Sequence, residues 1–450
     1  MDVPDPKYVK AEDGAYIAYQ VVGDGPVDVA WLFDFTGNLD CVWEYVAEYE
    51  WYSSLASFGR LILHDRRGTG LSSRDRPVPN LETRAADLRL VLDKVNSDQT
   101  VIGAYYEGLS PGLMLAASQP DRIRALVWWH PWPRTTWAPD YPWGEGPEEI
   151  RTARDMLVHW GSIEWALDWA DTQERANGFR PSQDDIRWMA KATRNTCTPD
   201  MAAALTEMWW QTDVRGLLPA VQTPSLLLAE EGESETGAVA DHVASLMPNA
   251  TVERVPRATR PRNSAEAATW YRPYRRAVEQ FIGLAPHAFA TDTVLATVLF
   301  TDIVGSTAHQ AVLGDHEWKE LVEHHHATVR QALHTWRGVE NDTAGDGFYA
   351  TFDGPARAIH CAHQIRDAVR SLGIEIRAGV HTGECELVDG KCAGISVSIG
   401  ARIAARARPS QVLVSQTVKD LVAGSGFTFQ SIGEHELKGV PEHWRIYDVA

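Results

Sequence analysis

Two aspartates in the C-terminal third of the chain have the residue type and the local setting of cation ligands. Asp302 follows the apolar run 294–300, and Asp346 lies between two glycines in Gly345-Asp346-Gly347. The apolar run predicts a strand, and the glycine pair predicts a hairpin turn that brings the second carboxylate beside the first. Oxygen ligands suit hard cations such as Mg²⁺ and Mn²⁺. The pattern therefore predicts a two-cation site.

The residues that follow Asp302 add a second element to this site. The segment 303–307, Ile-Val-Gly-Ser-Thr, opens a predicted helix, and the backbone amides at a helix start hold phosphate oxygens well. Two cations beside such a start could activate a ribose 3′-hydroxyl for attack on an α-phosphate and neutralise the departing pyrophosphate. The arrangement favours chemistry on a nucleoside triphosphate.

A different chemistry is indicated earlier in the chain. The segment 108–112, Gly-Leu-Ser-Pro-Gly, satisfies the G-x-S-x-G pattern of nucleophilic serines. In that pattern the nucleophile occupies a strained turn directly between a strand and a helix. The pattern alone does not decide whether Ser110 lies on such a turn, so its role depends on the elements around it.

The composition narrows the classes of protein that fit. A chain of 450 residues has room for two or three domains. A net charge of −19 argues against nucleic acid and anionic membranes as partners, and no apolar run reaches the length of a membrane span. The N-terminus has no export signal, and five cysteines without a C-x-x-C give neither a disulfide framework nor a zinc site. We expect a cytoplasmic protein.

The hydrophobic pattern divides the chain in two. Short β-rich runs alternate with helical stretches over residues 1–283, which predicts a parallel sheet with crossover helices. A second pattern covers residues 294–450, and we expect a short linker at 284–293. The predicted fold class is thus α/β for the first domain and α+β for the second.

The first domain resembles the α/β-hydrolase fold, with a helical cap at about 132–215. The resemblance rests on the loop 65–72, DRRGTGLS, and on the segment 116–127, AASQPDRIRALV. Counted back along the helix from Pro120, the spacing of the family places the nucleophile at Tyr106. Ser110 falls four residues later, about one helical turn, so we expect it inside the helix.

The other catalytic positions of the family also depart here. The acid falls at Glu233, and Arg260 or a neighbour takes the place of the histidine. Arginine cannot serve as the base that a nucleophile needs. Phe33 and Asp34 stand where the family has its oxyanion loop, and an aspartate there opposes a developing oxyanion. The resemblance implies a hydrolase scaffold without hydrolase chemistry.

Aromatic residues suggest what such a scaffold could do. Eleven of the 18 tryptophans fall between Trp128 and Trp210, in and around the expected cap. Aromatic-lined pockets are common small-molecule sites, and this favours a sensor for a small apolar ligand. The alternative, that the tryptophans only pack the core of the cap, stays open. The expected pocket residues are Phe33, Asp34, Tyr105, Tyr106 and Glu107.

The second domain resembles the class III nucleotidyl cyclase catalytic domain, which has a ferredoxin-like core, along its whole length. The ordered set that carries the resemblance is LFTDIVGST at 299–307, GDGF at 345–348 and RAGVHTG at 377–383. It implies conversion of ATP to 3′,5′-cyclic AMP and pyrophosphate, with two Mg²⁺ or Mn²⁺ per site. It also implies a homodimer with two sites, because each site of the family forms between two catalytic domains.

The same resemblance assigns roles to individual residues. Arg402 stabilises charge in the transition state, and Ser398 stands where the family has the asparagine that positions the ribose. The remaining positions are the metal ligands Asp302, Ile303 and Asp346, and the phosphate-binding residues Gly305, Ser306, Thr307, Arg377 and Lys438.

The base-reading pair departs from the adenylyl cyclase pattern. Asp342 stands where that pattern has a lysine, and Lys391 stands where it has an aspartate. An inverted pair can still serve adenine, since Asp342 accepts from the amino group and Lys391 donates to a ring nitrogen. Guanine, with its donors at N1 and N2, is the alternative, and a simple mutual pairing of the two residues is a third possibility.

Three functions therefore stay open. The first is a homodimeric cyclase with an inactive, ligand-sensing hydrolase domain, with ATP as the expected substrate and GTP as the alternative. The second is an active esterase with a regulatory cyclase-like domain, which needs a base such as His64, His130 or His242. The third is a pseudoenzyme that holds a nucleotide without converting it.

Overall fold

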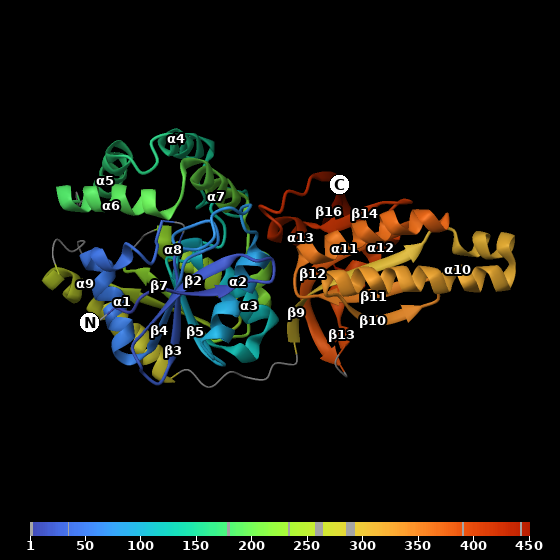
Figure 1. Ribbon diagram of the computed structural model, residues 1–450, viewed down its shortest axis with the longest axis horizontal. Helices are drawn as coiled ribbons and strands as arrows, with labels where there is room; N and C mark the ends of the chain where they lie inside the picture. Colours follow the sequence, from blue (N-terminus) through green and yellow to red (C-terminus); the bar gives the residue numbers. More distant parts are fainter. Residues whose placement is uncertain are drawn as a thin grey trace. The chain divides into compact units, whose positions relative to one another are not determined.

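The computed structural model describes residues 3–34, 36–177, 181–232, 235–256, 264–284, 293–388, 391–441 and 443–450. The chain divides into two compact units, Met1–Ala290 and Thr291–Ala450. Each unit is built on its own sheet with helices packed against it (Figure 1). Among the described helices, none combines the length and apolarity needed to cross a lipid bilayer.

The sheet of unit 1 has the strand order β1-β2-β4-β3-β5-β6-β7-β8. The first two strands are antiparallel, and those from β4 to β8 run parallel to one another. The central strands are apolar and almost fully buried, as expected where helices cover both faces. The strands are β1 (Lys7–Lys10), β2 (Tyr16–Val22), β3 (Asp28–Leu32), β4 (Arg60–His64), β5 (Thr100–Tyr105), β6 (Ile123–Trp129), β7 (Ser225–Glu230) and β8 (Ala250–Val255).

Alternation along the strands sends side chains to two different helix layers. Trp31, Trp51 and Trp129 form an aromatic cluster with the helices α1 (Val46–Phe58) and α9 (Ser264–Leu284). The helices α2 (Leu81–Lys94), α3 (Ser110–Ser118) and α8 (Glu235–Leu246) complete the unit outside its cap. Chain order reverses between the adjacent strands β3 and β5, so the sheet has a topological switch point there.

Four described helices between β6 and β7 form a separate layer, the cap. Trp160 and Trp165 pack edge to face in its core, 5.0 Å between ring centroids. Trp128 and Trp129 belong to β6 and are buried in the body of the unit. These four tryptophans therefore have packing roles. This agrees with the alternative that the tryptophans pack the core and do not line a ligand pocket. The cap helices are α4 (Pro147–Leu157), α5 (Ile163–Asn177), α6 (Gln183–Thr196) and α7 (Pro199–Gln211).

The sheet of unit 2 has the strand order β10-β11-β9-β12-β14-β16-β15, with β13 paired to β12. Its centre is the antiparallel pair β9 and β12, which places Asp302 directly opposite Arg377. The strands are β9 (Thr293–Ile303), β10 (Val339–Ala344), β11 (Gly347–Phe352), β12 (Ile376–Val388), β13 (Lys391–Ala393), β14 (Val412–Ser415), β15 (Phe429–Glu436) and β16 (His443–Val449).

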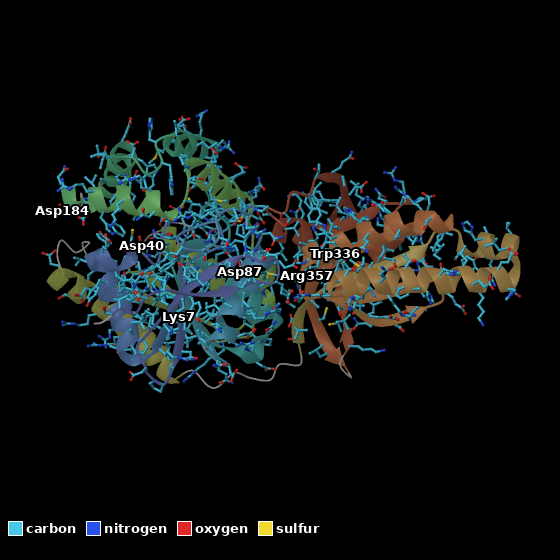
Figure 2. The ribbon with its side chains drawn as sticks, viewed as in Figure 1. Lys7, Asp40, Asp87, Asp184, Trp336 and Arg357 are labelled. Carbon is cyan, nitrogen blue, oxygen red and sulfur yellow. The ribbon has the colours of Figure 1, made fainter. Side chains whose placement is uncertain are left out.

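Helices cover both faces of this second sheet. The helices α10 (Ser306–Trp336) and α11 (Pro355–Ala368) share one core with the sheet, and Trp336 of α10 stacks on His360 of α11. Figure 2 labels Trp336 of α10 and Arg357 of α11. The helix α12 (Ile395–Arg406) packs against the sheet in a different core, through Ile399 and Ile403. A short helix, α13 (Gln416–Leu421), follows β14. The sheet therefore holds the ends of β9, β10 and β12 in fixed register between two helix layers.

Candidate active site

The two predicted cation ligands lie at the same end of the sheet in unit 2. Asp302 is the penultimate residue of β9, and Asp346 is in the two-residue turn between β10 and β11. Gly345 has a φ of 64°, which glycine tolerates in such a turn. Oδ2 of Asp346 accepts from the backbone N–H of Ile303 at 3.2 Å, which ties the turn to β9.

Burial and charge act together on Asp346. Partial burial raises the pKa of this carboxyl, and the nearby carboxylate of Asp302 raises it further, against hydrogen bonds that include one from the Ser306 hydroxyl. Two carboxylates that disfavour each other's charge form a place where a cation is stabilising.

Arg377 is already engaged with one of these aspartates. Its Nη2 and Nε donate to Oδ2 of Asp302 at 2.6 and 3.1 Å. Both side chains remain 37% exposed. Arg377, the arginine expected to contact phosphate, thus pairs with the predicted metal ligand Asp302 in the structure.

The helix α10 begins beside the two aspartates. Its N-cap, Gly305, has a φ of 67°, and Ser306 and Thr307 are its first residues. The first amides of a helix have no intrahelical acceptor, so they point outward at the site. The structure thereby brings the predicted phosphate cradle and the predicted cation ligands together.

His326 of α10 was not predicted from the sequence as part of this site. Its Nε2 hydrogen-bonds to the carbonyl of Gly345 at 3.0 Å, and its ring packs against Phe348. This contact fixes the turn that carries Asp346. The run His324-His325-His326 was the available signal, because helical spacing sends its members to different sides of α10.

A groove of about 440 Å³ opens next to the aspartates. Asp302, Asp342 and Arg377 line it from the sheet, and Val397 and Ala401 line it from α12. Small side chains on α12 leave room for a flat ring against the helix. The groove connects Asp302 with one member of the predicted base-reading pair, Asp342.

The members of that pair are separate in the structure. Asp342 is exposed on β10, where Oδ1 accepts from the N–H of Thr343 at 3.0 Å, and Lys391 is exposed on β13. Among the described side chains no ion pair joins them, so mutual pairing within one chain is absent. Tyr349 lies opposite Asp342, and its hydroxyl donates to the carbonyl of Cys392 at 2.8 Å.

Arg402 and Lys438 lie together, in a group apart from the aspartates. Nε of Arg402 donates to the backbone carbonyl of Lys438 at 3.1 Å, and Lys438 lines a different surface hollow with Glu436 and His443. Ser398 is exposed one turn earlier on α12. Within a single described chain, Arg402, Lys438 and Ser398 therefore do not line the groove of Asp302.

In unit 1, the strained turn lies at Tyr106. It follows β5 directly and has a φ of 48°, a conformation that costs a bulky residue free energy. Ser110 is the first residue of α3, only 1% exposed, and its Oγ has no hydrogen-bond partner among the described residues. Glu233 and Arg260, the predicted acid and base positions, lie outside the described residues.

The residues predicted to line one pocket, Phe33, Asp34, Tyr105, Tyr106 and Glu107, have different surroundings in the structure. Tyr105 packs with Trp31 and Trp129 in the aromatic cluster, because it is the last strand residue facing α1 and α9. Oδ1 of Asp34 is used within its own loop, where it accepts from Thr36 and Gly37. The turn reverses direction at Tyr106, so Glu107 points elsewhere.

Glu107 lies in a buried ion cluster that was not predicted from the sequence. Its two oxygens accept from Arg66 at 2.7 Å and from Arg84 at 2.9 Å, and all three residues are at most 7% exposed. Burial alone would raise the pKa of Glu107, but the two guanidinium groups outweigh it and hold the pKa at about 2. The available signal was an acidic residue next to the turn together with the arginines of the loop 65–72.

The C-terminal part of the chain is similar to known proteins. Residues 290–449 match the family model described as the adenylate and guanylate cyclase catalytic domain. An uncharacterised protein of Rhizobium meliloti is 30% identical over 176 residues, which are 34% of this chain and 17% of that protein. An uncharacterised protein of Mycobacterium tuberculosis is 31% identical over 155 residues, 33% of this chain and 53% of that protein. The chain thus spans about half or less of these relatives.

Unit 1 has a structural counterpart. A crystal structure reported with carboxylesterases of Nitrososphaera gargenis superposes with a TM-score of 0.50 at 15% identity, covering 62% of this chain and 98% of that one. At this identity the likeness shows the fold alone. Together with the strand order, it confirms the predicted α/β-hydrolase fold for unit 1.

Proposed function

We propose that this chain, whose C-terminal unit is a class III nucleotidyl cyclase catalytic domain, converts ATP to 3′,5′-cyclic AMP and pyrophosphate. The observation that carries the proposal is the convergence of Asp302, Asp346 and the start of α10 at one end of a groove that also holds Asp342. Carboxylates for cations, amides for phosphate and space for a base are what this reaction requires.

The residues present fit divalent cations. Among the described residues no group of three or more His, Cys, Asp and Glu side chains forms a metal cluster. Mg²⁺ typically takes one or two protein carboxylates and completes its shell with water and substrate phosphate. Asp302 and Asp346, with the carbonyl of Ile303, form such a partial set. When bound, the cations supply charge neutralisation at the phosphates and a more acidic 3′-hydroxyl.

The residues of the chain then orient the nucleotide. The amides of Ser306 and Thr307 would hold the terminal phosphates, and Arg377 would exchange Asp302 for a phosphate oxygen. In the reaction the 3′-oxygen forms a bond to the α-phosphorus, the bond from that phosphorus to the bridging oxygen of the β-phosphate breaks, and pyrophosphate leaves with its electron pair. The proton of the 3′-hydroxyl passes to water. Arg402 offsets the charge that develops on the α-phosphate.

Asp342 and Lys391 read the base in this proposal. Both are exposed and not joined to each other, so their polar atoms can contact a ring in the groove. Asp342 accepts from the adenine amino group, and Lys391 donates to a ring nitrogen. Asp342 would also accept from N1 and N2 of guanine, which makes GTP the competing substrate to be measured.

The active form is a homodimer in this proposal. The support is the separation of Arg402 and Lys438 from the aspartates within one chain. A second copy would place its own Arg402 at the groove, and each dimer would then hold two equivalent sites.

Unit 1 is proposed to act as a catalytically inactive sensor. The support is a tyrosine on the strained turn where a nucleophile belongs, and a buried Ser110. A tyrosine hydroxyl lies at the end of a ring and cannot substitute for a serine in the same elbow geometry.

The first experiment is cyclic nucleotide formation by the full-length protein with Mn²⁺, offered ATP and GTP separately. Asp302→Ala should abolish product, whereas Asp315→Ala, an exposed aspartate on α10, should leave the rate unchanged. Product from ATP alone supports adenylate cyclase, and product from GTP alone would replace the base assignment. No product from either nucleotide would contradict the cyclase proposal.

A mixing experiment tests the dimer. Asp302→Ala and Arg402→Ala should each be inactive, and an equal mixture should recover about a quarter of wild-type activity, since about half the dimers are mixed and each has one intact site. The control mixture, Asp302→Ala with Asp346→Ala, removes residues from the same side and should stay inactive. No recovery in the first mixture would contradict a shared site.

A further inference from the structure

The ion cluster of unit 1 distributes its carboxylates unevenly over its arginines. Arg66, Arg67 and Arg84 supply three guanidinium groups, each at most 7% exposed. The buried carboxylates facing them are two, Glu107 and Asp87, the latter pairing with Arg67 at 2.7 Å. A further carboxylate, Asp13, reaches Arg67 from the surface, where its side chain is 52% exposed. Arg67 thus has two carboxylate partners, whereas Arg66 and Arg84 share Glu107.

The crowding of like charges affects Arg84. Burial and the neighbouring Arg66 guanidinium together lower its pKa to about 10, against the attraction of Glu107. His64, at the end of β4, does not offset the imbalance. Burial, together with Arg66 and Arg84, lowers its pKa to about 4, so the imidazole is neutral near pH 7. Two buried guanidinium groups that share one carboxylate are costly unless a further anion joins them.

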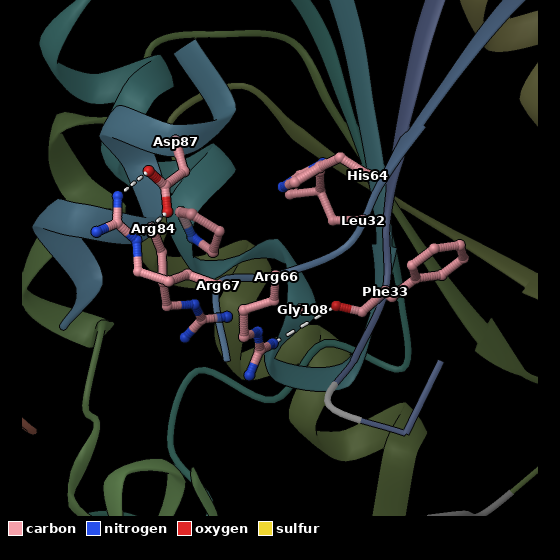
Figure 3. A pocket seen from close by; sticks show the side chains of 9 residues that line it. Leu32, Phe33, His64, Arg66, Arg67, Arg84, Asp87 and Gly108 are labelled. Carbon is pink, nitrogen blue, oxygen red and sulfur yellow. Dashed lines mark hydrogen bonds and ion pairs between the residues drawn. The ribbon is translucent and has the colours of Figure 1, made fainter. Parts of the chain in front are cut away.

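A small cavity lies within this cluster. Leu32 and His64 line it from the sheet, Arg84 and Asp87 from α2, and Arg66 from the loop after β4 (Figure 3). It has room for about one water-sized sphere. Figure 3 shows the arginines on one side and His64 with Leu32 on the other. The space is therefore bounded by guanidinium groups, one imidazole, the carboxylate of Asp87 and apolar carbon.

Two polar atoms of these lining residues lack partners. Nη1 of Arg66 and Nδ1 of His64 are buried and have no hydrogen-bond partner among the described residues. Arg66 is 93% buried by side-chain exposure, with Nη2 donating to Glu107. Buried donors in native proteins are almost always satisfied. An unsatisfied guanidinium nitrogen beside a cavity indicates a missing acceptor.

The loop that carries Arg66 is held rigidly in place. Asp65 accepts from the N–H of Leu39 at 2.9 Å and from that of Leu71 at 2.7 Å, and the Ser72 hydroxyl donates to the carbonyl of Asp65. The cavity lies where β3, β4 and β5 end, near the topological switch point, which is the usual ligand position in such sheets. The cation is thus fixed at a site suited to a ligand.

We propose that this cavity binds a small monovalent anion, either the carboxylate of a small acid such as formate or a halide. Arg66 and Arg84 neutralise its charge, His64 donates from its neutral ring, and Leu32 excludes a larger or divalent ion. This ligand class differs from the apolar molecule that the tryptophan content indicated. Binding stands on the cluster alone, whereas its meaning as a signal rests on the proposed sensor function of unit 1.

The test is calorimetric titration of the full-length protein with sodium formate, sodium chloride and sodium sulfate, at constant ionic strength made up with gluconate. We expect saturable binding of one formate or one chloride per chain and none of sulfate. Arg66→Gln should weaken binding about tenfold or more, the value of one charge-assisted hydrogen bond. Arg254→Gln, which removes an exposed arginine paired with Asp241 in the same unit, should bind as wild type does.

A second variant keeps the proposal falsifiable if Arg66→Gln fails to fold. Asp87→Asn removes a buried negative charge that lines the cavity, while Arg67 keeps its pair with Asp13. Burial already raises the pKa of Asp87, so the amide is a mild change. This variant should bind the anion several-fold more tightly.

The outcomes separate cleanly. Binding of formate without chloride, or of chloride without formate, identifies which anion the cavity prefers and supports the site. Absence of saturable binding, equal binding of sulfate, or unchanged affinity in Asp87→Asn would overturn it. Cyclic nucleotide formation is not the readout, so an inactive chain that binds the anion contradicts only the proposed function, and an active cyclase without binding contradicts only this inference.

Discussion

The two units place the same residue types at the ends of their sheets, and burial makes them differ. In unit 1, Glu107 and its two arginines are at most 7% exposed and hydrogen-bonded to one another. In unit 2, Asp302 and Arg377 form a comparable pair with both side chains 37% exposed. A buried pair is bound to its partners because separation leaves a charge without water, whereas a half-exposed pair can exchange partners at little cost.

The turns at these two sites differ in backbone strain. Tyr106 and Gly345 both have a positive φ, 48° and 64° respectively. Glycine adopts this conformation without cost, whereas a bulky residue does not. Unit 2 therefore presents Asp346 on an unstrained turn, and unit 1 has a strained turn at a bulky tyrosine. The comparison suggests that one site is built for exchange of ligands and the other mainly for a fixed charge arrangement.

The largest expected effect is on stability and follows from burial. Glu107→Ala leaves two buried arginines without their carboxylate and should destabilise unit 1 by about 3–5 kcal/mol. Asp302→Ala should change the stability of unit 2 by about 1 kcal/mol or less, because exposed pairs contribute little. Urea unfolding followed by tryptophan fluorescence reports mainly unit 1, which holds 15 of the 18 tryptophans. Equal losses in both variants would contradict the comparison.

A smaller effect is expected on the pH dependence of unit 1. The pKa of His64 is about 4 in the folded chain, lowered by burial and by Arg66 and Arg84, and ordinary, near 6.5, in the unfolded chain. The unfolded chain therefore binds more protons between these values, and stability falls as pH falls from about 6.5 to about 4, by roughly 3 kcal/mol. Above that window the contribution is complete.

His64→Gln serves as the matched variant for this pH effect. It removes the titrating group and should flatten the acid limb of unfolding measured at a series of pH values. His381 in unit 2, whose pKa burial alone lowers to about 3, stays intact and provides the internal comparison through circular dichroism. An unchanged acid limb in His64→Gln would show that other groups control the acid stability of unit 1.

The sequence predicted the parts of this structure that depend on regular patterns. Apolar runs predicted the strands, and the fold classes of both units are confirmed by the comparisons. The glycine pair around Asp346 predicted the turn, because few other residues allow a positive φ there. Local backbone chemistry of this kind is encoded within a few residues and can be recognised without the tertiary structure.

The features that the sequence did not predict depend on contacts between distant segments. Arg66, Arg84 and Glu107 come from three separate elements, and their meeting in a buried cluster depends on how these elements pack. Tyr105 and Glu107 were grouped because they are adjacent in sequence, but the turn at Tyr106 sends them to different layers. His326 acts on a turn 19 residues away through a helix face. Such contacts follow from packing rather than from local pattern.

A finer effect tests whether the turn of unit 2 positions Asp346. Gly345→Ala forces a side chain into the left-handed region and should cost about 1 kcal/mol, although the added carbon meets no atom within 4 Å. Gly373→Ala, with a φ of 72° and equally open space, should cost the same stability. Only Gly345→Ala should lower cyclic nucleotide formation, since it moves the turn that carries Asp346. Equal rates in the two variants would show that the turn tolerates the shift.

The smallest effect concerns two serines that each begin a helix. Ser110 begins α3 with a buried hydroxyl that has no partner among the described residues, and Ser306 begins α10 with a hydroxyl bonded to Asp346. Ser110→Ala removes an unsatisfied polar group and should leave stability unchanged or raise it by up to about 1 kcal/mol, with no effect on any activity. Ser306→Ala should leave stability nearly unchanged but lower cyclic nucleotide formation. If Ser110→Ala instead abolishes hydrolysis of a chromogenic ester, Ser110 is a nucleophile even though it does not lie on the strained turn at Tyr106. Its hydroxyl would then have a hydrogen-bond partner in another conformation of α3.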